Sequence, residues 1–445
     1  MTKPRILFFA RGYQADFFPT LQSDRYEAVF VTMTRAERDQ VRRRGCEVVA
    51  CFEADFDRLP VAPVPENYLI TSLMSDRFLG RFDRAERLTI LGKEIAFWSD
   101  LLDRYTPVAV VNELVAIEIS EVLLIEARKR GIRYLAGMNN VVDDWFYWIG
   151  NPMTLSGKYL ASPEPTAEAR SLARAYITEL KAKDYRPFYV KNLAGRRALK
   201  PLLIGLAKAV VWSWRARRTS PFRYEVYDEE YTKRVSVYFK SLVLGYDQIE
   251  DLPADGETIF YPLHQEPEAT LNYMSEFNAS QPATIENILK CLGPHQVLAV
   301  KEHPVDKGSL LRGKFQQLKK RYSNLYFFPG ELHGREVLAR SGRVVTLTST
   351  VGWEAAATGK PVHVLGEIWY DHVSGIDRVT NWPDLRAALR RSPADQPRMT
   401  EETLEDFVAT MVAASYPGNP FPHAGLYSQQ NIDKVIRAVV GGAGL

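Results

Sequence analysis

The chain has 445 residues, of which 46% are hydrophobic and 25% charged, a composition typical of a globular protein with more than one domain. The net charge of +3 is too small to indicate a nucleic-acid partner. The N-terminal apolar run is too short for a signal peptide, and no run reaches the roughly 20 residues of a membrane span. These features predict a cytoplasmic protein.

The first 150 residues alternate between short apolar runs and charged helical patterns. Strands are expected at 6–10, 28–32, 46–51, 108–111 and 134–136, and helices over 34–44, 84–105 and 116–130. This alternation predicts a parallel sheet with helices on both faces, in an N-terminal α/β domain over residues 1–160. Cys46, Cys51 and Cys291 lie in apolar runs without a CxxC pair, which predicts buried thiols in a reducing compartment.

Residues 161–250 show helix signals only and predict a helical connector. Within it, the stretch 196–218 carries seven basic residues and no acid, interleaved with leucine, valine and tryptophan. A basic amphipathic helix of this kind suits an anionic membrane surface, and a helix packed on the protein body with its arginines in solvent is the alternative. The residues expected at a membrane surface are Arg196, Arg197, Trp212, Trp214, Arg215, Arg217 and Arg218.

Strand and helix patterns alternate again in the C-terminal half. Strands are expected at 258–262, 296–301, 325–328, 343–347 and 361–365. They predict a second parallel α/β domain over residues 251–425. A final helix within 426–445 is expected to return to the first domain.

Polar residues follow two strands of the second domain and then start helices. His303 and Pro304 come after one strand, and Thr348, Ser349 and Thr350 come after another. Because the carboxyl ends of parallel strands meet at one edge of a sheet, we expect these groups to lie together. An imidazole beside the hydroxyl and amide groups of a helix start is suited to binding phosphate.

Three carboxylates are candidates for a role in chemistry. Glu268 lies in the proline-stiffened loop after the first strand of the second domain, where it could stabilise an electron-poor carbon. Glu354, one turn into the helix after Thr350, could bind a ribose diol, and Glu113, at a strand end of the first domain, could serve as a base or a ligand for an acceptor. Loop acidity and solvated helix glutamates are the alternatives. The pairs Asp55/Asp57 and Asp143/Asp144 do not follow strand ends, so no metal site is predicted.

Together these motifs resemble the capsule polysaccharide biosynthesis family, the KpsS/KpsC-like proteins, over about residues 255–380. The resemblance is carried in order by Tyr261-Pro262-Leu263-His264, Glu268, Lys301-Glu302-His303-Pro304, Thr348-Ser349-Thr350, Glu354-Ala355, Gly359-Lys360-Pro361-Val362, Gly366, Trp369-Tyr370 and Gly375. It implies a GT-B glycosyltransferase, in which two Rossmann-like domains face each other across a cleft. The domain at 1–160 would then bind the acceptor, and the domain at 251–425 would bind the nucleotide-sugar donor.

The family resemblance also implies a reaction. Some members transfer Kdo from CMP-Kdo to a lipid-linked primer, so the expected donor is CMP-linked Kdo or a related acidic sugar. The expected acceptor is a glycan or glycolipid at the inner membrane surface. Neither a metal nor another cofactor is predicted. A CDP-glycerol-type glycerophosphotransferase, a UDP-sugar enzyme on the same fold and a non-catalytic scaffold of capsule assembly are the alternatives.

The resemblance implies that His303, Ser349 and Thr350 contact the donor nucleotide and its phosphate, and the other roles rest on the positions of the residues after strands and at helix starts. The predicted donor-binding residues are His264, Lys301, His303, Thr348, Ser349, Thr350 and Glu354, and the predicted catalytic residues are Glu268, Glu113 and His303. Kdo-transferring members carry a glutamine and then an aspartate where this chain has His264 and Glu268. The sugar and the stereochemical outcome therefore stay open.

Overall fold

The computed structural model describes residues 3–68, 79, 82–182, 185, 203, 204, 206, 207, 210, 211, 245–253, 257–265, 268–304 and 306–445. The chain divides into two compact units. The first comprises residues 1–153, 159–172 and 409–445, and the second comprises 154–158 and 173–408. Residues 409–425 thus belong to the first unit, whereas the sequence assigns them to the second domain.

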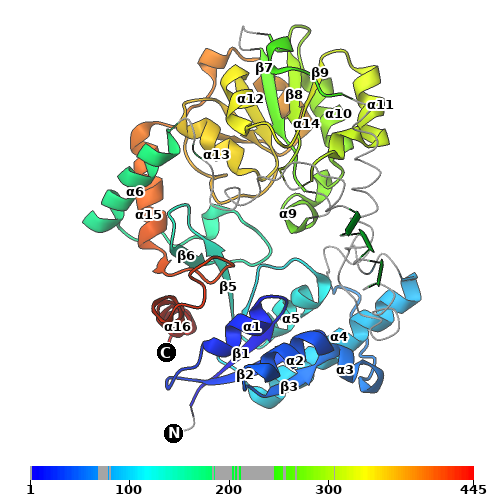
Figure 1. Cartoon of the computed structure of the whole chain (residues 1–445), viewed down its shortest axis with the longest axis vertical. Coiled ribbons are helices and arrows are strands. Elements are labelled where there is room, and N and C mark those ends of the chain that lie inside the picture. Colours follow the sequence, from blue (N-terminus) through cyan, green and yellow to red (C-terminus); the bar gives the residue numbers. More distant parts are fainter. Residues whose placement is uncertain are drawn as a thin grey trace. The chain divides into compact units, whose positions relative to one another are not determined.

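The first unit is built on a seven-stranded sheet with the order β13-β6-β5-β4-β1-β2-β3 (Figure 1). Strands β1 to β5 are parallel and follow the 3-2-1-4-5 order of a Rossmann-like fold. Strands β6 and β13 extend the sheet in antiparallel fashion, a feature that the expected parallel sheet does not include. The bounds are β1 Arg5–Ala10, β2 Glu27–Thr32, β3 Val48–Cys51, β4 Ala109–Asn112, β5 Arg133–Asn139, β6 Trp145–Trp148 and β13 Tyr416–Pro417.

Helices cover both faces of this sheet, as predicted. Neighbouring residues of a strand point to opposite faces, so apolar side chains on both faces need to be buried. Phe8 joins a core with α1 (Gln14–Phe17), α2 (Arg35–Arg43) and α16 (Gln429–Ala443). The ring of Phe9, the next residue, lies 4.8 Å from that of Trp98 on the opposite face. The helices of that face are α4 (Arg84–Tyr105), which begins with a capping box at Asp83, and α5 (Glu118–Lys129).

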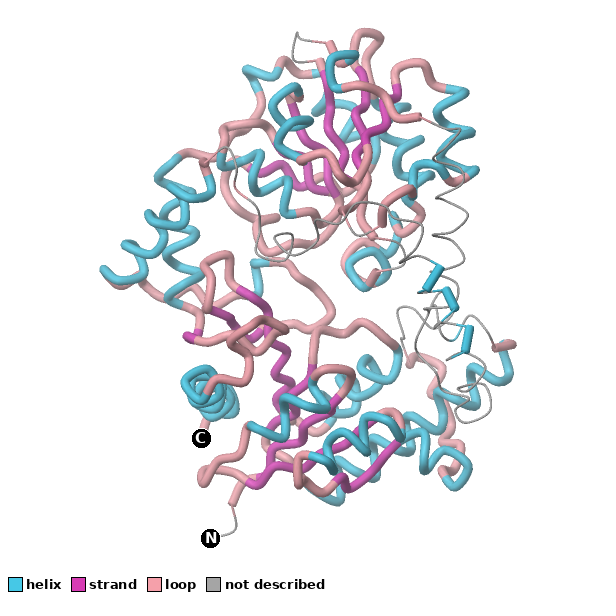
Figure 2. The backbone as a smooth tube through the Cα atoms, viewed as in Figure 1, coloured by secondary structure: helices cyan, strands magenta, loops and turns pink. Residues whose placement is uncertain are grey.

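The second unit contains a six-stranded parallel sheet with the order β12-β11-β10-β7-β8-β9 (Figure 2). In chain order this is again the 3-2-1-4-5-6 arrangement of a Rossmann-like fold. The bounds are β7 Thr258–Pro262, β8 Val297–Lys301, β9 Leu325–Phe328, β10 Arg343–Thr346, β11 Val362–Val364 and β12 Ile376–Arg378. The predicted α/β fold with two Rossmann-like units is therefore confirmed.

The helices of the second unit also form two layers. One core contains side chains of α10 (Gln281–Cys291), α11 (Gly313–Arg321) and α14 (Trp382–Arg390). Figure 1 shows α12 (Gly334–Arg340) and α13 (Thr350–Ala357) on the other side of the sheet. The remaining α-helices among the described residues are α3 (Phe52–Asp55), α6 (Ala167–Leu180), α9 (Ala269–Asn272) and α15 (Glu401–Ala413).

Each sheet has a switch point, where the strand order reverses. It lies between β1 and β4 in the first unit and between β7 and β10 in the second. The connections leave the two central strands in opposite directions there, which opens a crevice outside their carboxyl ends. Ligands of open α/β sheets bind at such points, so the residues that follow these strands are the candidates for function.

Cys51 and Cys291 are buried, as expected, whereas Cys46 is half-buried, and all three thiols are free. None of the described helices is both long and apolar enough to cross a bilayer. The residues expected at a membrane surface lie outside the described residues: Arg196, Arg197, Trp212, Trp214, Arg215, Arg217 and Arg218.

Candidate functional site

The switch point of the second sheet brings together polar residues from three neighbouring strands. His264 follows β7, His303 follows β8 and Thr348 follows β10, and these strands lie in the order β10-β7-β8. The backbone N–H of Thr348 donates to Nε2 of His264 at 3.3 Å. His303 is close enough to influence the pKa of His264. Three positions separated by as many as 84 residues of sequence thus share one sheet edge.

Both histidines of this edge are neutral at pH 7. Burial first, and the nearby His303 second, lower the pKa of His264 to about 3. Burial, followed by the charge of Lys301, lowers the pKa of His303 to about 4. Since Nε2 of His264 accepts a hydrogen bond, its Nδ1 carries the ring hydrogen and faces Oε2 of Glu268 at 3.9 Å. His264 therefore stands between Glu268 and the start of α13.

The start of α13 offers a ligand hydroxyl groups, whereas several of its backbone amides are already hydrogen-bonded within the protein. Ser349 is the N-cap, and its hydroxyl accepts from the N–H of Val351 at 3.2 Å. The N–H of Ser349 donates to Oγ1 of Thr346 at 3.0 Å, and that of Thr348 goes to His264. The expectation of free backbone N–H groups is therefore wrong for these three amides. The buried Oγ1 of Thr348 has no hydrogen-bond partner among the described residues.

Glycine at position 352 allows an aromatic residue to support this helix start. Tyr370 is fully buried, and its hydroxyl donates to the carbonyl of Ser349. A Cβ at Gly352 would lie 2.3 Å from the hydroxyl oxygen of Tyr370, closer than any van der Waals contact permits. Gly352 and Tyr370, which belongs to the predicted motif, are thus fixed by packing around Ser349.

Lys301 lies within the same edge but is held by the backbone. Its ammonium donates to the carbonyls of Glu302 at 2.9 Å and of Gly330 at 3.4 Å. Burial is the main reason that its pKa falls to about 8. Lys301 therefore contributes positive charge beside His303 from a fixed position.

Glu354 is buried and paired with an arginine that sequence reasoning missed. Nε of Arg335 donates to Oε2 of Glu354 at 2.9 Å. Burial raises the pKa of Glu354, and Arg335 opposes that rise. Arg335 also donates to the carbonyls of Leu180 and Ala182, at the end of α6. Glu354 thus joins α13 to α12 and to the residues after α6, and any ribose ligand would have to share it with Arg335.

The switch point of the first sheet holds an ion pair. Arg11 follows β1, Glu113 follows β4, and their side chains meet at 2.7 Å. Gly12 makes the turn after Arg11 with a φ of +49°, a conformation that glycine adopts without strain. Sequence reasoning named Glu113 but not Arg11, although the rule of polar residues after central strands applies equally to β1.

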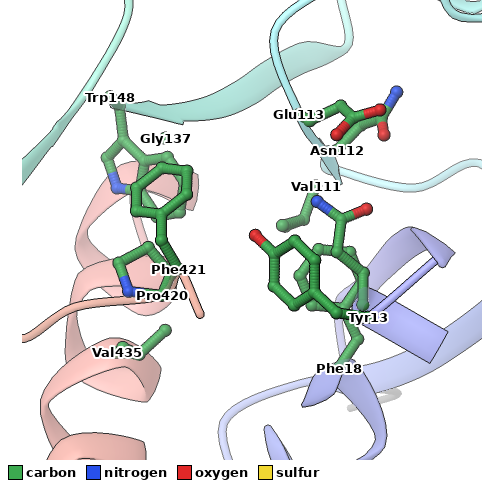
Figure 3. Close-up of a pocket in the computed structure, with 11 residues that line it drawn as sticks. Tyr13, Phe18, Val111, Asn112, Glu113, Gly137, Trp148, Pro420, Phe421 and Val435 are labelled. Atoms are coloured by element: carbon green, nitrogen blue, oxygen red, sulfur yellow. The ribbon is translucent and has the colours of Figure 1, made fainter. Parts of the chain in front are cut away.

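A small pocket that is open to solvent lies beside this ion pair, with Glu113 in its lining. Figure 3 shows Trp148, Pro420 and Phe421 on one side and Tyr13 and Glu113 on the other. Aromatic residues facing a carboxylate and a phenol make a surface that combines stacking with hydrogen bonding. The aromatic side of the pocket was not predicted, because two of its residues follow β13, far along the chain from Glu113.

Two groups of predicted residues emerge, one in each unit. Glu113 belongs to the first unit. The second unit contains the others, which are His264, Glu268, Lys301, His303, Thr348, Ser349, Thr350 and Glu354. Within the described ranges, no group of three or more His, Cys, Asp or Glu residues is placed to hold a metal ion.

Comparison with solved structures gives only weak likenesses. The chain is 12% identical to "Thermosulfurimonas dismutans KpsC, beta Kdo 2,7 transferase", with 77% of this chain and 88% of that chain covered and a TM-score of 0.35. The "Thermosulfurimonas dismutans KpsC, beta Kdo 2,4 transferase" is 16% identical, with 75% and 88% covered and a TM-score of 0.35. The S. aureus MnaA-UDP structure is 11% identical, with 100% and 98% covered and a TM-score of 0.32.

Comparison of sequences is more specific. No curated protein matches the chain. Residues 215–406, which include the switch-point edge of the second sheet, match the model of the family described as "Capsule polysaccharide biosynthesis protein". Over these residues, the chain is similar to the capsule polysaccharide biosynthesis protein family.

Proposed function

We propose that the protein is a glycosyltransferase of surface polysaccharide biosynthesis that uses a nucleotide-activated sugar. The observation that carries the proposal is the meeting of His264, His303 and the start of α13 at the switch point of the second sheet. The family match over residues 215–406 supports the polysaccharide context. A CMP-linked donor carrying Kdo or a related acidic sugar is the form that we favour, with a lipid-linked or saccharide acceptor.

In this proposal the second unit binds the donor and stabilises the departing nucleotide. Neutral His303 donates a ring N–H to the phosphate, and the hydroxyls of Ser349 and Thr350 donate beside it. The unpartnered hydroxyl of Thr348 is a further donor at the same helix start. Lys301 adds a nearby positive charge, which strengthens binding of an anion where water is excluded.

Glu268 would act on the sugar itself. Its side chain is 38% exposed, so it can reach a bound ligand, and His264 lies beside it at 3.9 Å. A carboxylate next to the anomeric carbon can stabilise or trap the electron-poor centre that forms as the nucleotide leaves. Glu354 would contact the ribose while it remains bonded to Arg335.

The acceptor would bind to the first unit, in the pocket that contains Glu113. The aromatic side formed by Trp148 and Phe421 can pack against a sugar ring, and the carboxylate of Glu113 can accept a hydrogen bond from a hydroxyl. One carboxylate oxygen of Glu113 already accepts from Arg11, which fixes the direction in which the other oxygen points. Glu113 would thereby orient or deprotonate the attacking hydroxyl.

A thermal-shift panel of CMP-, CDP- and UDP-linked compounds tests the proposed function. A ligand that binds only the folded state at 100 times its Kd stabilises it by about 2.7 kcal/mol. We expect CMP-linked sugars to raise the Tm and the His303→Ala variant to lose that rise. Stabilisation by CDP-glycerol or a UDP-sugar alone would assign the chain to a different reaction, and no response to any nucleotide would favour a scaffold.

We also propose that residues 196–218 attach the enzyme to an anionic membrane surface. Of this stretch the structure describes six residues in helical conformation. Leu203, Ile204, Val210 and Val211 among them have side chains that are between 47% and 58% exposed. Exposed apolar side chains next to basic residues match the two attractions of a lipid interface, burial of apolar area and contact with anionic headgroups.

Sedimentation with vesicles tests the membrane proposal. Replacing Arg215, Arg217 and Arg218 by glutamate should abolish binding to vesicles that contain anionic lipid, because each basic residue contributes about 1 kcal/mol near such a surface. The matched control replaces the exposed Arg42, Arg43 and Arg44, which changes the net charge equally at another place. Undiminished binding of the first variant, or equal loss in both, would contradict the proposal.

A further inference from the structure

The carboxylate of Glu302 connects three separate segments around His303. Glu302 lies between Lys301, the last residue of β8, and His303, and it is 1% exposed. Its Oε2 accepts from the N–H groups of Gly308 at 2.7 Å and Gly330 at 3.1 Å. Its Oε1 accepts from the N–H of Leu310 at 3.0 Å and from the hydroxyl of Tyr246 at 2.7 Å. One buried charge thus binds the loop after β8, the loop after β9 and the segment before β7.

Four donors around one carboxylate leave little freedom for the loop that carries His303. Hydrogen bonds to a buried charged group are stronger than those between neutral groups. Losing one leaves part of the buried charge without a donor, and its desolvation penalty is then no longer offset. Gly308 has a φ of +84°, so it makes a turn that other residues adopt only with strain. A Cβ at Gly330 would lie 2.9 Å from the carbonyl oxygen of His303, which shows how closely the β9 loop approaches the histidine.

Tyr246 is held in place independently of Glu302. The next residue, Asp247, pairs with the edge strand β9: its N–H donates to the carbonyl of Phe327 at 3.0 Å, and its carboxylate accepts from the N–H of Phe327 at 2.6 Å. Lys319 adds an ion pair to Asp247 at 2.8 Å. Tyr246 therefore contacts Glu302 from a segment that is held in place by its own pairing with β9.

We infer that Glu302 is a positioning residue for His303, and that Tyr246 sets its geometry from the segment that precedes β7. Neither residue needs to contact substrate for this role. Their effect would pass through the backbone of the His303 loop to the orientation of the imidazole. The inference rests on the proposed function for its catalytic consequence, but not for its structural one.

The test compares Tyr246→Phe with a matched control, Tyr322→Phe. Both tyrosines are half-buried against the same core and donate their hydroxyl to a glutamate, but the partner of Tyr322 is Glu286, on α10. We expect Tyr246→Phe to lower kcat about tenfold, the effect of one lost hydrogen bond to a charged group, and to shift the ring signals of His303 in NMR spectra of histidine-labelled protein. Tyr322→Phe should leave both unchanged, with a similar small loss of Tm.

The NMR readout separates this inference from the proposed function. The chain has seven histidines, and the signals of His303 are identified by their loss in the His303→Ala variant. If the wild type transfers sugar but Tyr246→Phe leaves both kcat and the His303 signals unchanged, the positioning role is overturned. If no nucleotide-sugar is a substrate, the proposed function fails, and the His303 signals still decide the positioning role.

Glu302→Gln provides a second variant at the carboxylate itself. A glutamine amide has one acceptor oxygen and one donor nitrogen, so its NH₂ group would face two of the four donors that surround Glu302. We expect His303 signals to move further than in Tyr246→Phe. Unmoved signals in a folded Glu302→Gln protein would also overturn the inference.

Discussion

Replacing His303 by alanine is expected to reduce transfer by about 10²-fold or more, the usual effect of removing one hydrogen-bond donor from a developing negative charge. His303 follows β8 at the switch point of the second sheet, beside His264 and Lys301. Its pKa of about 4 keeps the ring neutral at the pH of an assay, so it acts as an N–H donor and not as a fixed cation. The loss should appear mainly in kcat, because the phosphate gains charge as the nucleotide leaves.

A matched control for this variant is His295→Ala. His295 is exposed and lies just before β8, at the opposite end of that strand from His303, so its removal leaves the switch point untouched. The control should retain wild-type kcat and donor KM. Near-normal transfer by a folded His303→Ala protein would remove His303 from the mechanism.

Replacing Glu268 by glutamine is expected to lower kcat by about 10²- to 10³-fold. The two side chains have nearly the same shape, but glutamine cannot carry the negative charge that would stabilise an electron-poor anomeric carbon. Because the Glu268 side chain is 38% exposed, the substitution should cost little stability. Steady-state kinetics and a thermal melt measure the two effects separately.

Glu276→Gln is the matched control for the second variant. Glu276 is an exposed glutamate just after α9. Its replacement by glutamine removes the same charge from the same region of the surface. Its kcat should equal that of the wild type. If Glu268→Gln transfers sugar as fast as Glu276→Gln, the charge of Glu268 has no part in the reaction.

The strands of both sheets could largely be predicted because they are buried on both faces. Such strands are continuous apolar runs, as in 6–10, 258–262 and 325–328, and each was expected within two residues of its observed bounds. Helix starts were also readable where a capping box is present, as at Thr34 before α2. These signals are local, so they do not depend on the rest of the fold.

The missed strands lack that local signal. Strand β6 is a short aromatic run that pairs with β5 and with β13, more than 260 residues later in the chain. The side chains of β12 are half-buried or exposed, because it lies at the edge of the sheet. Their strand conformation is stabilised by pairing with a distant partner, which no single stretch of sequence reveals.

The site was predictable to the level of its strand ends. Placing polar residues after parallel strands located His264, His303 and Thr348 at one edge. It could not reveal the ion pairs Arg335–Glu354 and Arg11–Glu113, because these depend on which loops face each other in space. The use of the first amides of α13 by neighbouring side chains was hidden for the same reason.

The location of bound CMP in a crystal of the protein tests the central claim most directly. We predict that its phosphate lies within hydrogen-bond distance of the His303 ring and of the hydroxyls of Ser349 and Thr350. Occupancy of this edge should disappear in crystals of His303→Ala grown at the same nucleotide concentration. CMP bound elsewhere, for example only in the pocket beside Glu113, with the edge of β7, β8 and β10 vacant, would contradict the account.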